Sequence, residues 1–240
     1  MPINEKEIIK VINETLGINE DRPRSKKTIK EAYVVQAKKY NIQTDALSDK
    51  SIKANIENFD TLVQSLNEVS AKLDTADRSD VNQMDSSFRE LKLAETYCLN
   101  GAFLTAYHFD NIADPSSKIT MDSLPYMRLA RDFGSFEEWQ RDFIACAMSG
   151  RDGFVVTCYN GFLDRYMNFF LDENSNNVPM NCVPVVVLST KERMYFKDYL
   201  NDRRKYVFAM MKELNWTLIE KRIKRADRLA KIFSMGLGGE

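Results

Sequence analysis

Residues 153–163 read GFVVTCYNGFL, and at this point the apolar pattern changes from the period of a helix to that of a strand. Asn-Gly is a strong signal for a tight hairpin turn, so we expect antiparallel strands on both sides of Asn160 and Gly161. The returning strand is expected to continue to Leu171. The β-branched run PVVVL at residues 184–188 predicts a short buried strand. Together these segments predict a small antiparallel sheet.

Helical periodicity dominates the chain before this sheet. Apolar residues recur at three- and four-residue spacing in four segments, residues 4–17, 28–41, 48–73 and 87–109. The last two segments are long and amphipathic, and a polar stretch at residues 74–85 separates them. We therefore expect a long antiparallel α-hairpin whose two helices bury each other's apolar faces.

Helices return after the sheet, and one more precedes it directly. Ser135, followed three residues later by Glu138, has the pattern of a capping box at a helix start. Further helices are expected at residues 192–201, at 205–214 and from Trp216 onward. This order predicts an α+β fold, in which an N-terminal long antiparallel α-hairpin is followed by a C-terminal domain with a small antiparallel β-sheet flanked by helices.

The same order divides the 240 residues into four parts. We expect an N-terminal helical extension at residues 1–46, an α-hairpin domain at 47–113, an α+β domain at 114–226, and a helix end with a flexible tail at 227–240. The first residues lack the apolar core of a signal peptide and the composition of a transit peptide. No apolar run approaches the roughly 20 residues that span a bilayer. We therefore expect a protein that is neither secreted nor membrane-bound.

Charge and histidine content argue against several classes of protein. Lys and Arg total 34 against 35 Asp and Glu, a formal net charge of -1, which argues against a protein held globally on nucleic acid by its charge. His108 is the only histidine, so a multi-histidine metal site or a histidine relay is nearly excluded. The four cysteines, at 98, 146, 158 and 182, form no C-x-x-C pair. Three of them lie in apolar runs, where cysteine is a small buried hydrophobe rather than a reactive thiol, and a reducing compartment is expected.

Several short motifs then follow one another along the chain. FGSFEEW at residues 133–139 precedes the hairpin and the strand that begins at Pro184, and the later motifs are Tyr195-Phe196, Asn201, Arg203, Tyr206 and Asn215-Trp216. Upstream lie LSDKSI at 47–52, LNG at 99–101 and FDNI at 109–112. The order and spacing of these motifs resemble the iron/manganese superoxide dismutase family over roughly residues 47–226. The resemblance implies the fold of that family.

The resemblance also implies a site for one redox metal, held by three histidines and one aspartate, at which superoxide is disproportionated. Carried over position by position, the histidines fall at Asn55, Thr105 and Arg193, and the aspartate falls at Ser189. Neutral amide and hydroxyl oxygens are poor ligands for iron or manganese, and a permanent guanidinium cation repels the ion. We therefore expect no metal, no other cofactor and no enzymatic activity.

One residue of the family's ligand signature is retained, Glu192. In family dimers this glutamate reaches the histidine ligand of the other subunit, whereas here its neighbour is Arg193. The resemblance thus implies an interface in which Glu192 of one copy pairs with Arg193 of the other. The alternative is an ordinary solvated helix start, and both interpretations stay open.

The last helix carries a second candidate contact surface. Its cations are Lys221, Arg222, Lys224, Arg225 and Arg228. They form either a basic face for an acidic partner or RNA, or the solvated side of a C-terminal helix, and the second interpretation is favoured.

The favoured function is a non-catalytic structural or assembly component of a larger particle, built as a homodimer or homo-oligomer with other proteins as partners. A phage virion is favoured over a ribosome-like assembly, so the chain is expected in a virion or the cytoplasm, and nucleic acid is not a favoured partner. One alternative is a metal-dependent redox enzyme with a rebuilt site, drawn from Asp60, Asp110, Glu192, Cys182 and His108. The other is an RNA-binding module that uses the basic C-terminal helix.

Overall fold

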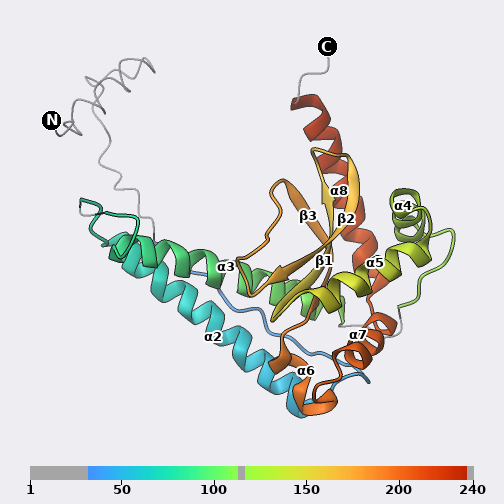
Figure 1. The fold of residues 1–240 in the computed structure, drawn as a ribbon, viewed down its shortest axis with the longest axis horizontal. Coiled ribbons are helices and arrows are strands. Elements are labelled where there is room, and N and C mark those ends of the chain that lie inside the picture. The colour runs from blue at the N-terminus through green and yellow to red at the C-terminus, as the bar shows by residue number, and fades with distance from the viewer. Residues whose placement is uncertain (1–31, 80, 113–116, 237–240) are drawn as a thin grey trace.

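The computed structural model describes residues 32–79, 81–112 and 117–236, and the helix predicted at residues 4–17 lies outside them. Within these ranges the chain forms the predicted α+β fold (Figure 1). The helices are α2 (Asp49–Asp74), α3 (Ser87–Asn111), α4 (Leu124–Phe133), α5 (Phe136–Ser149), α6 (Glu192–Tyr199), α7 (Arg203–Lys212) and α8 (Trp216–Gly236). The strands are β1 (Gly153–Asn160), β2 (Arg165–Asp172) and β3 (Cys182–Ser189).

Helices α2 and α3 pack along each other as the predicted hairpin, which reaches away from the sheet in Figure 1. Ser48 caps α2 by accepting a hydrogen bond from the N–H of Ser51, and Ser86 caps α3 by accepting one from the N–H of Arg89. The apolar faces meet as expected, and their buried side chains include Phe59, Leu62, Leu66, Leu73, Cys98 and Phe109.

The segment before α2 differs from the prediction of a helix over residues 28–41. Residues 32–43 are not helical, so the prediction is wrong there, and residues 28–31 lie outside the described part. The side-chain amide of Asn67 on α2 donates to the carbonyl of Val35 at 2.9 Å and accepts from the N–H of Val35 at 2.7 Å. A residue bonded in this way cannot use its backbone groups in a helix of its own.

The three strands form one antiparallel sheet in the order β2-β1-β3, so β1 lies in the centre. A bulge between Thr157 and Cys158 interrupts the pairing of β1 with β3. The connection between β1 and β2 is longer than the predicted two-residue turn, because β2 begins at Arg165. Asn160 Oδ1 accepts hydrogen bonds from the backbone N–H groups of Phe162 and Leu163, two and three residues later, and these bonds organise the loop.

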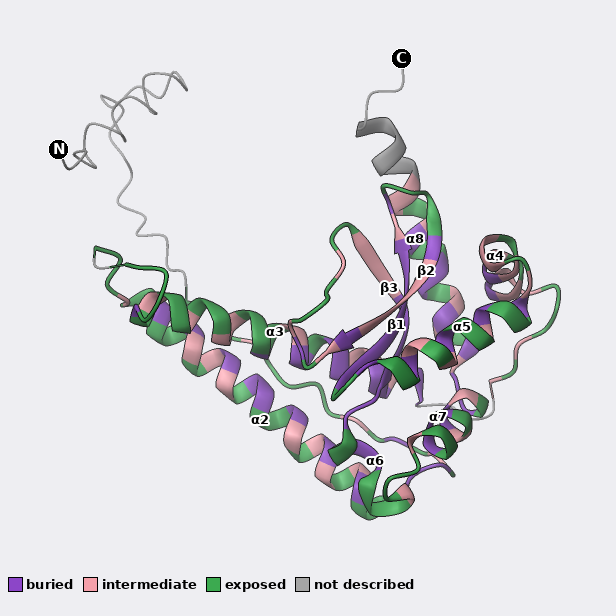
Figure 2. Ribbon diagram, viewed as in Figure 1, coloured by how far each residue is buried: buried purple, intermediate pink, exposed green. Residues whose placement is uncertain are grey.

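Both faces of β1 are covered, as the buried colouring of the sheet in Figure 2 shows. On one face Val155 and Tyr159 belong to the main hydrophobic core, with Trp139 of α5. On the other face Phe154, Val156 and Cys158 pack with side chains of α3. The sheet is therefore a layer between α3 and α5.

Helix α5 before the sheet and the helices after it form as predicted, with small shifts of their ends. Ser135 caps α5 by accepting the N–H of Glu138 at 3.0 Å. Helix α8 buries its predicted apolar positions Trp216, Ile219 and Ile223. In the described ranges, no helix combines the length and the apolar character needed to cross a membrane.

Candidate functional site

The structure places in the interior three of the four residues that the resemblance assigns to the family's ligand positions. Asn55 lies on α2, Thr105 on α3 and Ser189 at the end of β3, and their exposed fractions are 3%, 2% and 0%. The elements that carry them pack together, α2 against α3 and α3 against β3. Arg193, in the first turn of α6, is exposed instead.

Two of these interior residues form hydrogen bonds that join elements. Asn55 Nδ2 donates to the carbonyl of Met194 at 3.0 Å and so joins α2 to α6. Ser189 Oγ accepts from the N–H of Lys191 at 3.4 Å, and the Ser189 carbonyl accepts from the Tyr206 hydroxyl at 2.8 Å. Both residues therefore help to position the connection between β3 and α6.

Lys191 adds a buried cation to this region, and the sequence analysis missed it. Its Nζ donates to Asn174 Oδ1 and lies 4.9 Å from the centre of the Phe154 ring. Burial lowers the pKa of Lys191 to about 8, and Arg193 adds to this effect, whereas two nearby carboxylates oppose it. Lysine is rarely buried unless it is paired, and the partner Asn174 lies 17 residues earlier in the chain. The residues next to Lys191 in sequence therefore gave no sign that it is buried.

A second buried cation, Arg222, lies where α8 meets α3. Its Nη1 donates to Asn111 Oδ1 at 2.7 Å, and its guanidinium carbon lies 3.8 Å from the centre of the Tyr107 ring. Asn111 Oδ1 also accepts the N–H of Val187 at 3.1 Å, so this amide links α3, β3 and α8. Arg222 is only 8% exposed, so its predicted place on an exposed basic face is wrong. Helix α3 offers it an acceptor and an aromatic ring instead of solvent.

His108, also on α3, is fully buried. Burial lowers the pKa of the His108 ring to about 4, although the backbone of Val187 acts to raise it. Neither ring nitrogen has a hydrogen-bond partner of ordinary geometry in the described part of the chain. The ring is therefore a neutral core group at pH 7.

The residues at the four ligand positions do not fit an iron or manganese ion. They offer one amide, two hydroxyls and a guanidinium, whereas these metals favour imidazole and carboxylate ligands. The buried Lys191 adds positive charge beside Ser189, whereas the buried Arg222 lies at the interface of α8 with α3 and pairs with Asp110 at 3.5 Å. Over the residues that the structure describes, no group of three or more His, Cys, Asp or Glu could hold a metal ion. No catalytic step is therefore assigned to a metal here.

The side chains of the alternative redox site are spread over separate places and form no metal-holding group among the described residues. Asp60 is exposed on α2 and Glu192 is exposed on α6, whereas His108 lies in the core. Asp110 of α3 pairs with Lys38 at 2.7 Å. Cys182, on β3, packs against the apolar cluster that contains Cys158 and accepts a hydrogen bond from Asn160.

Glu192 and Arg193, the pair expected at a subunit interface, are accessible. Both side chains are exposed at the start of α6, and neither forms an ion pair with another residue of the described ranges. The helix start does not depend on the Glu192 side chain, because Asp152 Oδ1 accepts the N–H of Glu192 at 2.7 Å. The charged groups of both residues are therefore available to a partner.

Over residues 216–230 of α8, the exposed cations are Lys221, Lys224, Arg225 and Arg228. Lys224 forms an ion pair with Glu220 at 2.5 Å. With Arg222 buried and Lys224 paired, this surface carries less uncompensated positive charge than the sequence predicts. The role of this surface as a contact face remains a prediction.

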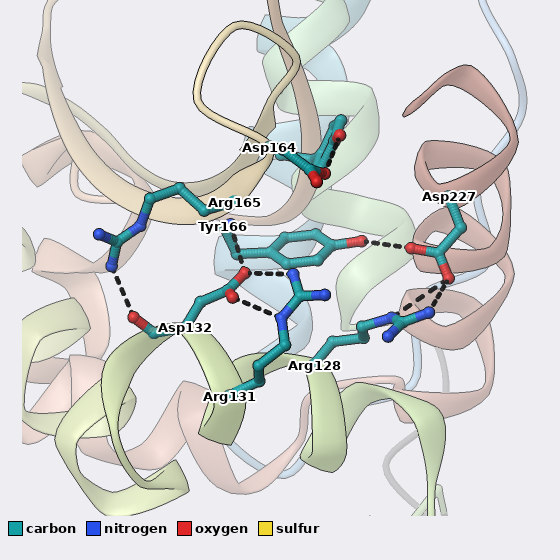
Figure 3. A network of polar contacts seen from close by, with 8 residues as sticks. Arg128, Arg131, Asp132, Asp164, Arg165, Tyr166 and Asp227 are labelled. Carbon is teal, nitrogen blue, oxygen red and sulfur yellow. Dashed lines mark hydrogen bonds and ion pairs between the residues drawn. The ribbon is translucent and has the colours of Figure 1, made fainter. Parts of the chain in front are cut away.

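Another polar cluster lies where α4, β2 and α8 meet (Figure 3). Arg128 of α4 pairs with Asp227 of α8 at 3.0 Å, and Asp227 also accepts the Tyr166 hydroxyl at 3.4 Å. Asp132 pairs with Arg131 at 2.6 Å and accepts the N–H of Tyr166 at 2.7 Å. Both carboxylates are therefore bound by arginine, and the cluster fastens α4 and α8 to the sheet.

Comparisons with known proteins agree with the architecture. The family model described as iron/manganese superoxide dismutases, C-terminal domain, matches residues 126–222. The iron superoxide dismutase of Aquifex aeolicus is 28% identical over 186 residues, which are 76% of this chain and 86% of the relative. That of Cupriavidus metallidurans is 29% identical over 185 residues, 76% of this chain and 91% of the relative.

These matches contradict one prediction. The chain was expected to be no enzyme because the metal ligands are replaced, whereas the matching family and its curated relatives are enzymes. Ligand positions alone are thus insufficient grounds for that prediction.

Proposed function

We propose that this chain, as a member of the iron/manganese superoxide dismutase family, works as a component of a larger protein assembly. It enters that assembly as a homodimer. One observation carries the proposal: Glu192 and Arg193 stand side by side at the surface, both exposed and without ion-pair partners in the described part of the chain. This role depends on the outer surface and needs no metal in the interior.

Two-fold symmetry explains why adjacent opposite charges suit a dimer. In a symmetric interface a contact from residue i to residue j is repeated from j to i. Glu192 of each copy can therefore pair with Arg193 of the other, which gives two carboxylate–guanidinium contacts from one pair of residues. Exposed apolar side chains at the same element, Phe196 and Leu200, support the contact because they would lose solvent on association.

A second surface supports the larger assembly. Helix α3 exposes Leu93, Leu99 and Phe103 by 50%, 47% and 42%, and the Phe103 ring lies 4.3 Å from that of Tyr107. Apolar side chains that gather on one exposed helix face are typical of protein contact surfaces. The particle that we favour is a phage virion, because the near-neutral charge of -1 does not suit a ribosome-like assembly.

Charge reversal tests the dimer directly. Arg193→Glu places two carboxylates at each contact, so we expect the dimer dissociation constant to rise at least about tenfold in sedimentation equilibrium. The double variant Glu192→Arg with Arg193→Glu exchanges the two charges and should restore wild-type association. Lys72→Glu changes an exposed charge in the last turn of α2, far along that helix from Asn55 and its contact with α6, and serves as the control with no expected effect.

Three results would contradict the proposal. The wild-type chain could sediment as a monomer at all concentrations, Arg193→Glu could leave the dimer unchanged, or the double variant could dissociate as readily as the single one. The last result would show that the two side chains are not reciprocal partners.

A further inference from the structure

Two of the four cysteines lie against each other on the face of the sheet that α3 covers. Cys158 is in the central strand β1, and Cys182 is the first residue of the edge strand β3. The register sets Cys158 opposite Pro184 and Cys182 opposite Asn160, so the cysteines are diagonal neighbours on one face. Cys182 packs against the apolar cluster that contains Cys158, and the Cys158 thiol donates to the Cys182 sulfur there.

A second donor points at the same sulfur. Asn160 Nδ2 donates to Cys182 Sγ at 3.2 Å. The orientation of this amide is fixed from its other end, because Asn160 Oδ1 accepts the N–H groups of Phe162 and Leu163 at 3.0 and 2.9 Å. The loop between β1 and β2 thus holds an N–H donor against Cys182, and two donors on one sulfur stabilise a thiolate.

The four cysteines therefore differ in the pKa of their thiols. The hydrogen bond from Cys158, aided by Asn160, lowers the pKa of Cys182 to about 7 against the effect of burial. The same hydrogen bond and burial raise the pKa of Cys158 well above its usual range, so Cys158 stays protonated. Burial, with Asp142, raises the pKa of Cys146 to about 11, and burial raises that of Cys98. Reactivity follows the thiolate fraction, so Cys182 stands apart.

We infer that Cys182 and Cys158 form an oxidant-sensitive pair, in which a hydroperoxide oxidises Cys182 and Cys158 then closes a disulfide between β3 and β1. Cys182 is only half-buried and lies on the edge strand, where a small hydroperoxide can reach it. Cys158 is buried beside it and is shielded from direct attack. The first cysteine is therefore the attacking group and the second is the resolving group.

The disulfide forms in two steps. The Cys182 thiolate attacks one oxygen of the hydroperoxide, the S–O bond forms as the O–O bond breaks, and the alkoxide or hydroxide that leaves takes up a proton. The Cys158 thiol then loses its proton and attacks the sulfenic sulfur of Cys182, and the S–S bond forms as the S–O bond breaks. The proton and the hydroxide leave as water. The two thiols lose two electrons, and the hydroperoxide gains them.

Peptide mapping of the full-length chain tests this chemistry. The reduced protein is treated with one equivalent of hydrogen peroxide at neutral pH, alkylated and digested without reductant. We expect the first product to be the linked peptides of Cys158 and Cys182. In Cys158→Ser the second step is blocked, so dimedone should trap a sulfenic acid at Cys182. Oxidation that begins at Cys98 or Cys146, or a Cys182 that dimedone does not label in Cys158→Ser, would overturn the inference.

Alkylation rates give a second readout that needs no oxidant. At neutral pH Cys182 should react with iodoacetamide at least about 100-fold faster than Cys146. Asn160→Ala removes one donor to the sulfur and should slow Cys182 by about fivefold. Cys146→Ser is the matched control and should leave the Cys182 rate unchanged. Equal rates at Cys182 and Cys146 in the wild-type chain would contradict the thiolate assignment.

Discussion

At the scale of single residues, His108 shows most clearly what burial does to chemistry in this chain. The ring is fully buried on α3, and its pKa is lowered from 6.5 to about 4. A group whose pKa is lowered by folding contributes stability that is present above its unfolded pKa and is lost as the pH falls toward its folded pKa. We therefore expect the free energy of unfolding to fall between pH 6.5 and 4, by up to about 3 kcal/mol from this residue.

Two measurements check the His108 prediction. Because there is only one histidine, its imidazole signal in a proton NMR titration is unambiguous and should keep its neutral position down to about pH 5. In His108→Phe the fall in unfolding free energy between pH 6.5 and 4 should be smaller than in the wild type. A histidine signal that titrates near 6.5 would show that the ring is not buried.

Helix α3 depends on one glycine to pack beneath the loop after β2. A Cβ on Gly101 would collide with the Asn174 side chain and press on Leu62. Asn174 is also the acceptor for Lys191, so displacing it would leave a buried ammonium group without its partner. We expect Gly101→Ala to lower the free energy of unfolding by about 2 kcal/mol, although alanine favours helices more than glycine does.

A double-mutant cycle separates this collision from other effects. In an Asn174→Ala background the added methyl group meets no amide, so Gly101→Ala should be milder there. The coupling free energy from chemical denaturation should be at least about 1 kcal/mol. Strictly additive effects would mean that the two residues do not compete for the same space.

Helix α8 provides a matched pair of arginines. Arg222 is buried against Asn111 and Tyr107, whereas Arg225, three residues later, is exposed. We expect Arg222→Ala to lower the free energy of unfolding by about 3 kcal/mol, because it removes hydrogen bonds and packing from the interface of α8 with α3. Arg225→Ala should change it by less than about 0.5 kcal/mol. Equal effects in thermal or urea unfolding would contradict this assignment.

The elements were largely predictable from sequence because their signals are local. Helical spacing in α2 and α3 and the serine at each helix start are properties of neighbouring residues, and the β-branched run of β3 is equally local. Residues 32–41 were predicted wrongly because their conformation depends on the hydrogen bonds between Val35 and Asn67, which lies 32 residues further along the chain. The inward turn of Arg222 depends in the same way on Asn111, which lies 111 residues earlier.

The candidate site was predictable only in part. The positions of Asn55, Thr105 and Ser189 followed from the family resemblance, and all three are buried. The buried Lys191 carries no local signal, since its partner Asn174 lies in a loop on another part of the sheet domain. The contact between Cys158 and Cys182 also arises only when β1 and β3 pair.

At the scale of the whole molecule, the chain has an architecture that agrees with the iron/manganese superoxide dismutases it is similar to, while different residues stand at the positions that the resemblance assigns to their metal ligands. Asn55 and Ser189 bond to the start of α6, and two buried cations, Lys191 and Arg222, bind amide oxygens of the protein. Histidine and carboxylate ligands are absent from those positions. We therefore expect hydrogen bonds between side chains and backbone, rather than a transition-metal ion, to hold this interior together.

Metal analysis of the purified full-length chain tests that claim most directly. A matched variant restores the family's ligands with Asn55→His, Thr105→His, Ser189→Asp and Arg193→His, and both proteins are produced in medium that contains iron and manganese. We predict less than about one tenth of a metal equivalent in the wild-type chain and a clear gain in the variant. One tightly held equivalent of iron or manganese in the wild-type chain would contradict the account.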